Sequence, residues 1–149
     1  MLELLALTAA LSTASPAPLP TPQVLPAIKV QAPKATLRLQ IARTEGQRER
    51  GLMSVTHLPA RTGMIFVFDT DGPVAFWMKD TLIPLDMVFV GADGTVRKIY
   101  AAVPVVPEDM ADDRIPRETG NAKYVIELSS REAAADGLSV GTKLKSLPK

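Results

Sequence analysis

The chain of 149 residues contains no cysteine and a single histidine. Without cysteine, disulfide bonds, thiolate catalysis and cysteine-ligated metals are all excluded. His57 alone cannot form a two-histidine site, and its place before Leu58-Pro59 is typical of an ordinary hydrophilic loop position. The sequence also lacks Gly-x-Ser-x-Gly and a glycine-rich phosphate loop. We therefore expect neither a metal site nor a cofactor.

Charges of the two signs are nearly equal in number, with 17 lysines and arginines against 16 aspartates and glutamates. Nucleic-acid binding usually requires a clear excess of basic residues, so this balance argues against a nucleic-acid partner. The sequence is 46% hydrophobic and 22% charged, which is typical of one globular domain. Asp69-Thr-Asp71-Gly72 begins like a calcium-binding loop but lacks the later ligands, so we interpret it as a turn.

The first 15 residues resemble a secretory signal. Leu2 to Leu11 is apolar except at Glu3 and Thr8, and four small residues follow. The apolar stretch is too short for a bilayer span, which needs about 20 residues. Glu3 departs from the basic start of such signals; a start codon placed too far downstream would account for it, and a buried helix is the alternative. We expect a periplasmic or secreted protein with no stable membrane span in its mature form.

Prolines gather in the segment that follows. Six of the 13 prolines lie between residues 16 and 33. Proline at this density removes backbone donors and favours extended conformations. We therefore expect a tether over residues 16–34 and a single folded domain over residues 35–147.

Short β-rich runs dominate this domain. Between 36 and 42, Leu37, Leu39 and Ile41 alternate with polar residues, as in a half-buried strand. Further strands are expected over 64–68, 74–78, 85–90, 95–100, 123–128 and 143–147, with a hairpin loop over 91–94. Many short strands with few helices predict a mainly β fold, namely a single antiparallel β-sandwich or barrel-like domain.

Two short helices are expected from their capping signals. The capping boxes are Thr44 with Gln47, and Ser129 with Glu132. The first predicts a helix over 45–50 and the second a helix over 130–136. A glycine placed to end the helix follows each of them.

The segment from Phe76 to Asp86 breaks the ordinary strand pattern. It contains the only tryptophan, Trp77, and the charged residues Lys79, Asp80 and Asp86 in an otherwise apolar stretch. Each charge needs a partner or water there. A tryptophan face beside carboxylates and an ammonium suits a sugar or another polar ring, so we predict a ligand site at these four residues. The alternative is structural, with Trp77 in the core and Lys79 paired with a carboxylate.

A charged segment over 107–122 fits neither helical nor strand periodicity. A loop of this length inside a compact domain is either a lid over a site or a solvated connection. We predict that it covers part of the ligand site.

Arg50 and Glu127 are two further charges next to apolar residues. A guanidinium against a carboxylate would fix the first helix on the sheet, so we predict a structural ion pair between them. Another interpretation is catalytic. Asp86 with Glu127 or Asp80 could act as the paired acids of a hydrolase directed at carbohydrate, if the carboxyl groups lie about 5–10 Å apart.

Several segments together resemble the domain of unknown function 192 family of bacterial and archaeal proteins. The resemblance is carried by Arg50-Gly-Leu-Met53, Leu58-Pro59, Gly63-Met-Ile-Phe-Val-Phe68, Phe76-Trp-Met-Lys-Asp-Thr81, Ile83-Pro-Leu-Asp86, Gly94, Tyr124-Val-Ile-Glu-Leu128 and Gly141. It implies a compact, mainly antiparallel β domain, often exported, and no particular activity. The chain departs from the family pattern at Asp80, where asparagine is usual, and at Thr142, where an acid is common.

Three functional hypotheses follow. The first is a small extracytoplasmic binding or accessory module for a polar small molecule or an envelope component. The second is the hydrolase with acids around Asp86. The third is a structural scaffold that binds no ligand.

Overall fold

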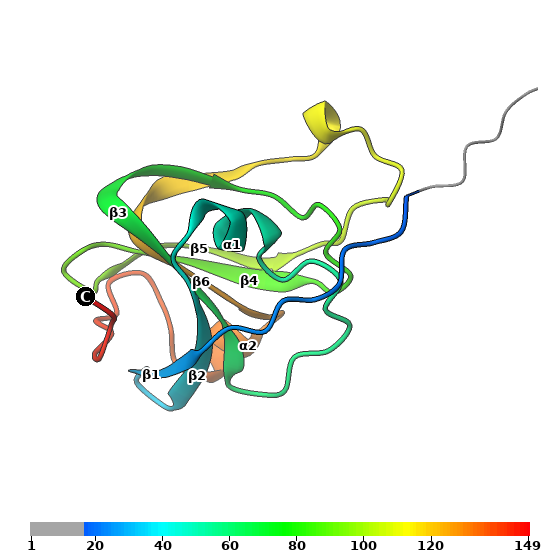
Figure 1. Cartoon of the computed structure of the whole chain (residues 1–149). Helices are drawn as coiled ribbons and strands as arrows, with labels where there is room; N and C mark the ends of the chain where they lie inside the picture. The colour runs from blue at the N-terminus through cyan, green and yellow to red at the C-terminus, as the bar shows by residue number, and fades with distance from the viewer. Residues whose placement is uncertain (1–16) are drawn as a thin grey trace, which may run out of the picture.

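The computed structural model describes residues 17–149, and the predicted signal over residues 1–15 lies outside them. Six strands form one sheet in the order β1-β2-β3-β6-β4-β5, accompanied by two short α-helices and a 3-10 helix, η1 (Figure 1). The elements are β1 Ala27–Gln31, β2 Thr36–Ala42, α1 Glu45–Arg50, β3 Thr62–Phe76, β4 Leu85–Val90, β5 Val96–Val103, η1 Asp112–Arg114, β6 Glu118–Ser129 and α2 Glu132–Ala135.

The mainly β prediction with two short helices is confirmed, although the sheet is mixed and does not close into a barrel. β2 and β3 run parallel and are connected through α1, whereas the other neighbouring strands are antiparallel. A parallel pair needs a crossover connection, and the segment from α1 to β3 provides it. β3 and β6 lie at the centre of the sheet, so the residues they carry are positioned by a strand on each side.

β3 is longer than the sequence pattern indicates. It joins the strands expected over 64–68 and 74–78 into one strand of 15 residues. Its register against β6 shifts between Val67 and Gly72. Such an irregularity bends a strand without ending it. The polar residues at 69–71, interpreted as a turn, therefore lie in a bend within β3.

The sheet begins and ends differently from the predicted boundaries. β1 lies within the segment predicted as a tether, and its Val30 is fully buried. The strand expected over 143–147 is not formed. Instead, that segment touches the sheet through two isolated bridges, from Lys143 to Thr95 and from Lys145 to Gln31. The alternating pattern correctly predicted that Leu144 is buried. It could not show that the segment forms isolated bridges and no continuous strand.

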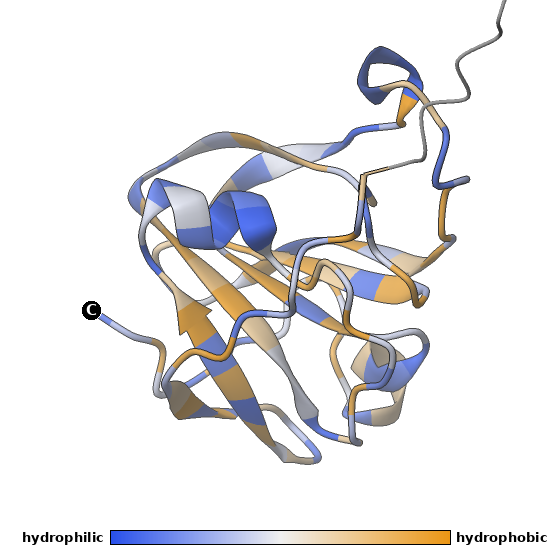
Figure 2. Ribbon diagram, turned by 45° about the vertical axis from the view of Figure 1, so that its right-hand side comes forward, coloured by the Kyte–Doolittle hydropathy of each residue, from blue (hydrophilic) through white to orange (hydrophobic). Residues whose placement is uncertain are grey.

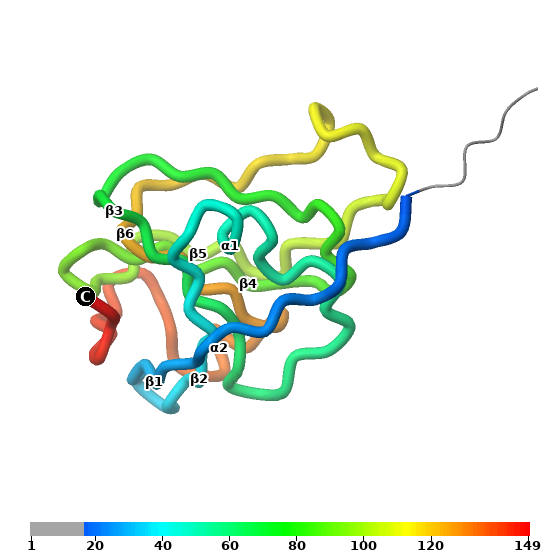
Figure 3. Tube along the Cα trace, viewed as in Figure 1, coloured from blue at the N-terminus to red at the C-terminus, as the bar shows by residue number. Residues whose placement is uncertain are grey.

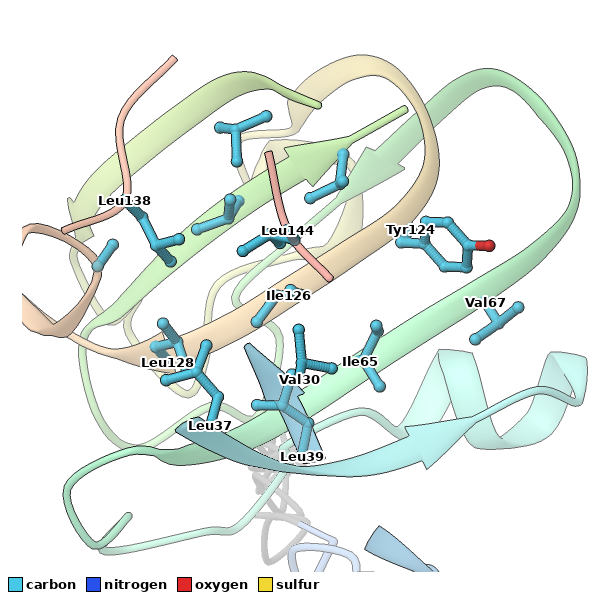
Figure 4. Close-up of a cluster of buried hydrophobic side chains, with 14 residues drawn as sticks. Val30, Leu37, Leu39, Ile65, Val67, Tyr124, Ile126, Leu128, Leu138 and Leu144 are labelled. Carbon is cyan, nitrogen blue, oxygen red and sulfur yellow. The ribbon is translucent and has the colours of Figure 1, made fainter. Parts of the chain in front are cut away.

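Two hydrophobic clusters lie on the two faces of the sheet, as alternation along β4 shows. Val88 and Val90 belong to the first cluster, and Met87 and Phe89 to the second. In the first cluster, side chains of β1, β2, β3 and β6 meet Leu138 and Leu144 of the C-terminal segment (Figure 4). The central strands are mostly hydrophobic, whereas α1 and the loop containing η1 are largely hydrophilic (Figure 2). The second cluster lies beneath α1 and supports the candidate site.

Capping explains one helix and fails for the other. In α1, Thr44 and Gln47 form the predicted capping box, and Gly51 ends the helix. The box predicted at Ser129 is wrong. Ser129 is the last residue of β6, and the residue before α2 is Arg131, whose side chain caps nothing. The sheet pairing of Ser129 with Leu85 prevents it from serving as a cap.

The N-terminal segment crosses the molecule next to α1 before it enters β1 (Figure 3). The amide nitrogen of Gln23 donates to the carbonyl oxygens of Gln47 and Gly51, both at 2.9 Å. The Gln47 carbonyl also accepts from the Gly51 nitrogen at 3.0 Å, and the bonds from Gln23 fasten the N-terminal segment to the end of α1. Within residues 17–149 no helix is long and apolar enough to span a bilayer.

Candidate functional site

A groove runs between α1 and the segment that follows β3. Its open part has a volume of about 490 Å³ and is called the outer groove. The residues that line it are Pro20, Gly46, Glu49, Arg50, Met53, Trp77, Lys79 and Asp80. At its inner end lies a cavity of about 30 Å³, the inner chamber. The chamber is lined by Arg48, Glu49, Arg50, Gly51, Leu52, Met53, Phe66, Phe76, Trp77, Lys79, Thr81 and Glu127. Glu49, Arg50, Met53, Trp77 and Lys79 line both spaces, which therefore lie next to each other.

Trp77 directly follows the last residue of β3 and lines this groove. Phe76 and Met78 are buried in the second cluster, and Phe76 packs edge-to-face on Phe66 with ring centroids 4.8 Å apart. Trp77 and Lys79, by contrast, are only half-buried and line both the outer groove and the inner chamber. Trp77 therefore forms a wall of the groove and is not a core residue.

Asp80 closes a tight turn at the rim of the groove. Its φ angle is 50°, in the left-handed region, which aspartate and asparagine adopt more readily than most residues. Its carbonyl oxygen accepts a hydrogen bond from the Ser54 nitrogen at 2.8 Å. The residue type at this position is thus favoured by backbone conformation, whether or not the side chain contacts a ligand.

Lys79 has a partner in the 107–122 segment. Its Nζ lies 2.6 Å from Asp112 Oδ2 and 5.2 Å from the centre of the Trp77 ring. The guanidinium carbon of Arg117 lies 3.8 Å from the same ring. The loop therefore attaches to the outer side of the site residues and arches beyond the end of β3 (Figure 1). No residue of 107–122 is among the lining residues of either space, so the attachment does not amount to a lid.

Glu127 lies at the bottom of the inner chamber. It pairs with Met64 on one neighbouring strand and with Met87 on the other, which places its side chain on the face of the second cluster. Only 4% of its surface is exposed. Burial in these apolar surroundings raises the pKa of Glu127 from 4.5 to about 8. At neutral pH the carboxyl is therefore mainly protonated and can donate as well as accept.

Arg50, the last residue of α1, lines the chamber with Glu127. The sequence predicted an ion pair between the two. Across residues 17–149, however, the pairs within 4.0 Å involve other residues. Arg50 Nε is buried and has no hydrogen-bond partner among the described atoms. The structure thus brings the two groups to one cavity without a direct contact between them.

Asp86 lies on the other face of the sheet from Glu127. It pairs with Leu128 of the first cluster, and its side chain is 1% exposed. Its carboxylate accepts from three backbone nitrogens, those of Ala102 at 2.8 Å and of Arg131 and Ala133 at 3.0 Å each. The predicted grouping of Asp86 with Lys79 and Trp77 is therefore not formed. The charged side chain of Asp86 in this apolar strand therefore anchors backbone nitrogens of other segments.

The residues missed by the sequence come from two separate segments. Glu49 and Met53 flank Arg50 at the end of α1, and Pro20 belongs to the proline-rich segment. Their spacing carries no signal, because a crossover and an N-terminal segment bring them together only in the folded chain. A second groove of about 460 Å³ includes His57, which is exposed. Within residues 17–149 no three acidic or histidine side chains are grouped for a metal ion.

Comparisons with known proteins agree with the resemblance predicted from the residues. The sequence model of the DUF192 family, described as "Uncharacterized ACR", matches residues 27–146. A Sinorhizobium meliloti 1021 crystal structure, provisionally described as a transcription regulator, is 34% identical with a TM-score of 0.69; the match covers 83% of this chain and 96% of that one. A Novosphingobium aromaticivorans DSM 12444 structure of unknown function is 31% identical with a TM-score of 0.68, covering 87% and 94%. No curated protein matches the chain.

Proposed function

We propose a function from the groove itself for this chain, which belongs to the DUF192 family, because the family description assigns no activity. The proposal is a binding module that holds a small polar ligand between α1 and Trp77. The observation that carries it is an open groove that shares lining residues with an inner chamber, where Arg50 has no ion-pair partner within residues 17–149. Buried polar groups without protein partners are costly for stability, and a ligand would satisfy them.

The walls of the outer groove fit such a ligand. Trp77 and Met53 offer apolar surface, while Glu49 and Asp80 offer acceptors. Binding sites for small molecules commonly combine apolar walls with a few convergent polar groups. The hydrolase alternative is less well supported. The carboxylate of Asp86 accepts hydrogen bonds from three backbone nitrogens, and Asp86 lies on the face of the sheet opposite Glu127.

A regulatory role like the description of the S. meliloti protein has less support here. A transcription regulator that contacts DNA directly needs a basic surface, and this sequence has a net charge of only +1. The groove between α1 and Trp77 therefore remains the basis of the proposal.

Ligand binding at the groove should change the fluorescence of the chain, because Trp77 is its only tryptophan. We expect a polar small molecule from a screen of sugars, amino acids and organic acids to raise the melting temperature and to shift the Trp77 emission. Lys79→Met should weaken binding. It should cost about 1 kcal/mol or less in stability, since the Lys79–Asp112 pair is partly exposed.

Lys143→Met is the matched control, because Lys143 forms a comparable exposed pair with Asp93 and lines neither the outer groove nor the inner chamber. Its binding should equal that of the natural chain. A ligand that stabilises the protein without any change in Trp77 emission would place the site elsewhere. Stabilisation by no compound in the screen would favour the scaffold hypothesis.

We further propose that the mature protein acts outside the cytoplasm. Support comes from the apolar stretch Leu2 to Leu11, the small residues after it and the proline-rich segment that links it to the domain. Cells that express the full-length chain with a C-terminal tag should show the tag in the periplasm or the medium. Recovery of an unprocessed chain from the cytoplasm alone would contradict this location.

A further inference from the structure

Charged residues of both signs line the outer groove and the inner chamber. The inner chamber contains Arg50 and the carboxyl group of Glu127, and both can donate hydrogen bonds when Glu127 is protonated. Asp80 lines only the outer groove and Glu127 only the chamber, whereas Glu49, Arg50 and Lys79 line both spaces. Lys79 is paired with Asp112, so a ligand that satisfies Arg50 together with Glu49 and Asp80 carries an anionic group at its inner end and a cationic group farther out.

The chamber is small, with a volume of about 30 Å³, so it admits a compact anionic group and not a whole ligand. The planar guanidinium of arginine also matches the geometry of a carboxylate with two parallel hydrogen bonds.

We infer that the inner chamber binds the carboxylate of an amino acid, with Arg50 and Glu127 as donors. This inference rests on the proposed function and specifies its ligand class. The ammonium group of the ligand lies toward Glu49 and Asp80 in the outer groove. The amino-acid side chain packs along Trp77 and Met53, where the volume of about 490 Å³ admits side chains of varied size.

Calorimetric titration of the full-length chain with the common amino acids tests this ligand class. For the amino acid that binds best, we then compare the amine without a carboxylate, the acid without an amine, and inorganic phosphate. The amino acid should bind at least tenfold more tightly than any of these three. Arg50→Gln should weaken it at least tenfold. Arg43→Gln, a nearby exposed arginine outside both spaces, should leave the affinity unchanged.

The pH dependence distinguishes the role of Glu127 from a purely structural one. The charged groups that face the chamber with it are Arg48, Glu49 and Arg50 of α1, and Lys79 after β3. An ionised Glu127 would repel a carboxylate, so affinity should fall as the pH rises from 6 toward 8.5, the range around the pKa of about 8. Glu127→Gln keeps a donor and cannot ionise, so its affinity should stay constant over that range.

Several results would overturn the inference. One is equal binding of the amine that lacks a carboxylate. Another is a sugar that shifts Trp77 emission and binds equally well to Arg50→Gln, which would leave the proposed function intact. Absence of binding by every amino acid at about 10 mM also overturns it. Failure of all compounds, sugars included, would remove the proposed function as well.

Discussion

Replacing Asp86 by alanine should lower the free energy of unfolding by roughly 3 kcal/mol or more. The carboxylate is buried and accepts from the backbone nitrogens of Ala102, Arg131 and Ala133. Alanine would leave these donors without a partner, and each buried unsatisfied group costs roughly 1–3 kcal/mol. The bonds also tie the end of β5 and the start of α2 to β4, so several segments should loosen together. Urea unfolding followed by circular dichroism measures the change.

Asp86→Asn is a milder second variant, which keeps part of the hydrogen bonding in case the alanine variant does not fold. Its single carboxamide oxygen can replace Oδ1, which serves two of the three nitrogens, but its amide group cannot accept from Ala133. We expect an intermediate loss of about 1–3 kcal/mol. The control is Asp69→Ala, an exposed acid of β3, which should change stability by less than about 0.5 kcal/mol. An alanine variant as stable as the Asp69 control would show that Asp86 anchors nothing.

Local sequence signals predicted local structure well. The capping box of Thr44 and Gln47 and the glycine at 51 gave the bounds of α1, because every atom involved lies within one turn. β4 was predicted over its full length. The hairpin loop over 91–94 is also formed, with hydrogen bonds from Gly91 to Thr95 and from Gly94 to Gly91. Each of these depends on residues that are neighbours in the chain.

The errors arose where distant segments decide the outcome. At the start of α2, the backbone nitrogens of Arg131 and Ala133 donate to the carboxylate of Asp86, which is distant in the sequence, and not to a local capping residue. Ser129, the expected cap, is the last residue of β6. β1 pairs with β2 although prolines flank it at 26 and 33. A sequence shows neither the strand order nor the parallel pairing of β2 with β3. Those two facts determine which charges share a face.

The candidate site was predicted only in part. Trp77, Lys79 and Asp80 do line one groove, because a broken alternation pattern marks them within a single segment. The sequence also singled out Arg50 and Glu127, and the structure places both at the inner chamber of the same groove. Their connection with Trp77 could not be predicted, since it arises from the packing of α1 over the second cluster. Asp86 also interrupts an apolar stretch, as a site residue would, but its carboxylate accepts from three backbone nitrogens.

The stability of the natural chain should fall as the pH rises from about 5 to 8. Burial raises the pKa of Glu127 to about 8, against 4.5 for an exposed glutamate. The folded state therefore holds a proton that the unfolded state releases above about pH 4.5. The contribution of protonated Glu127 to stability is fully present below that pH. It is lost by roughly 1.4 kcal/mol per pH unit until the pH passes the pKa of Glu127 in the folded state. The total loss amounts to a few kcal/mol, measurable by urea unfolding at a series of pH values.

Glu127→Gln should remove most of this slope, because a glutamine does not ionise. Its unfolding free energy should be close to that of the natural chain at pH 5 and higher at pH 8. Asp136, whose pKa burial also raises, acts in the same direction in both proteins, so the difference between the two curves isolates Glu127. The pKa of Asp71 is lowered, chiefly by its hydrogen bond with Arg97, and that of Asp93 by its hydrogen bonds with Thr95; both act at more acidic pH. Parallel curves would mean that the pKa of Glu127 is not raised in the folded protein, and a natural chain that gains stability with pH relative to Glu127→Gln would indicate the pair with Arg50 that the sequence predicted.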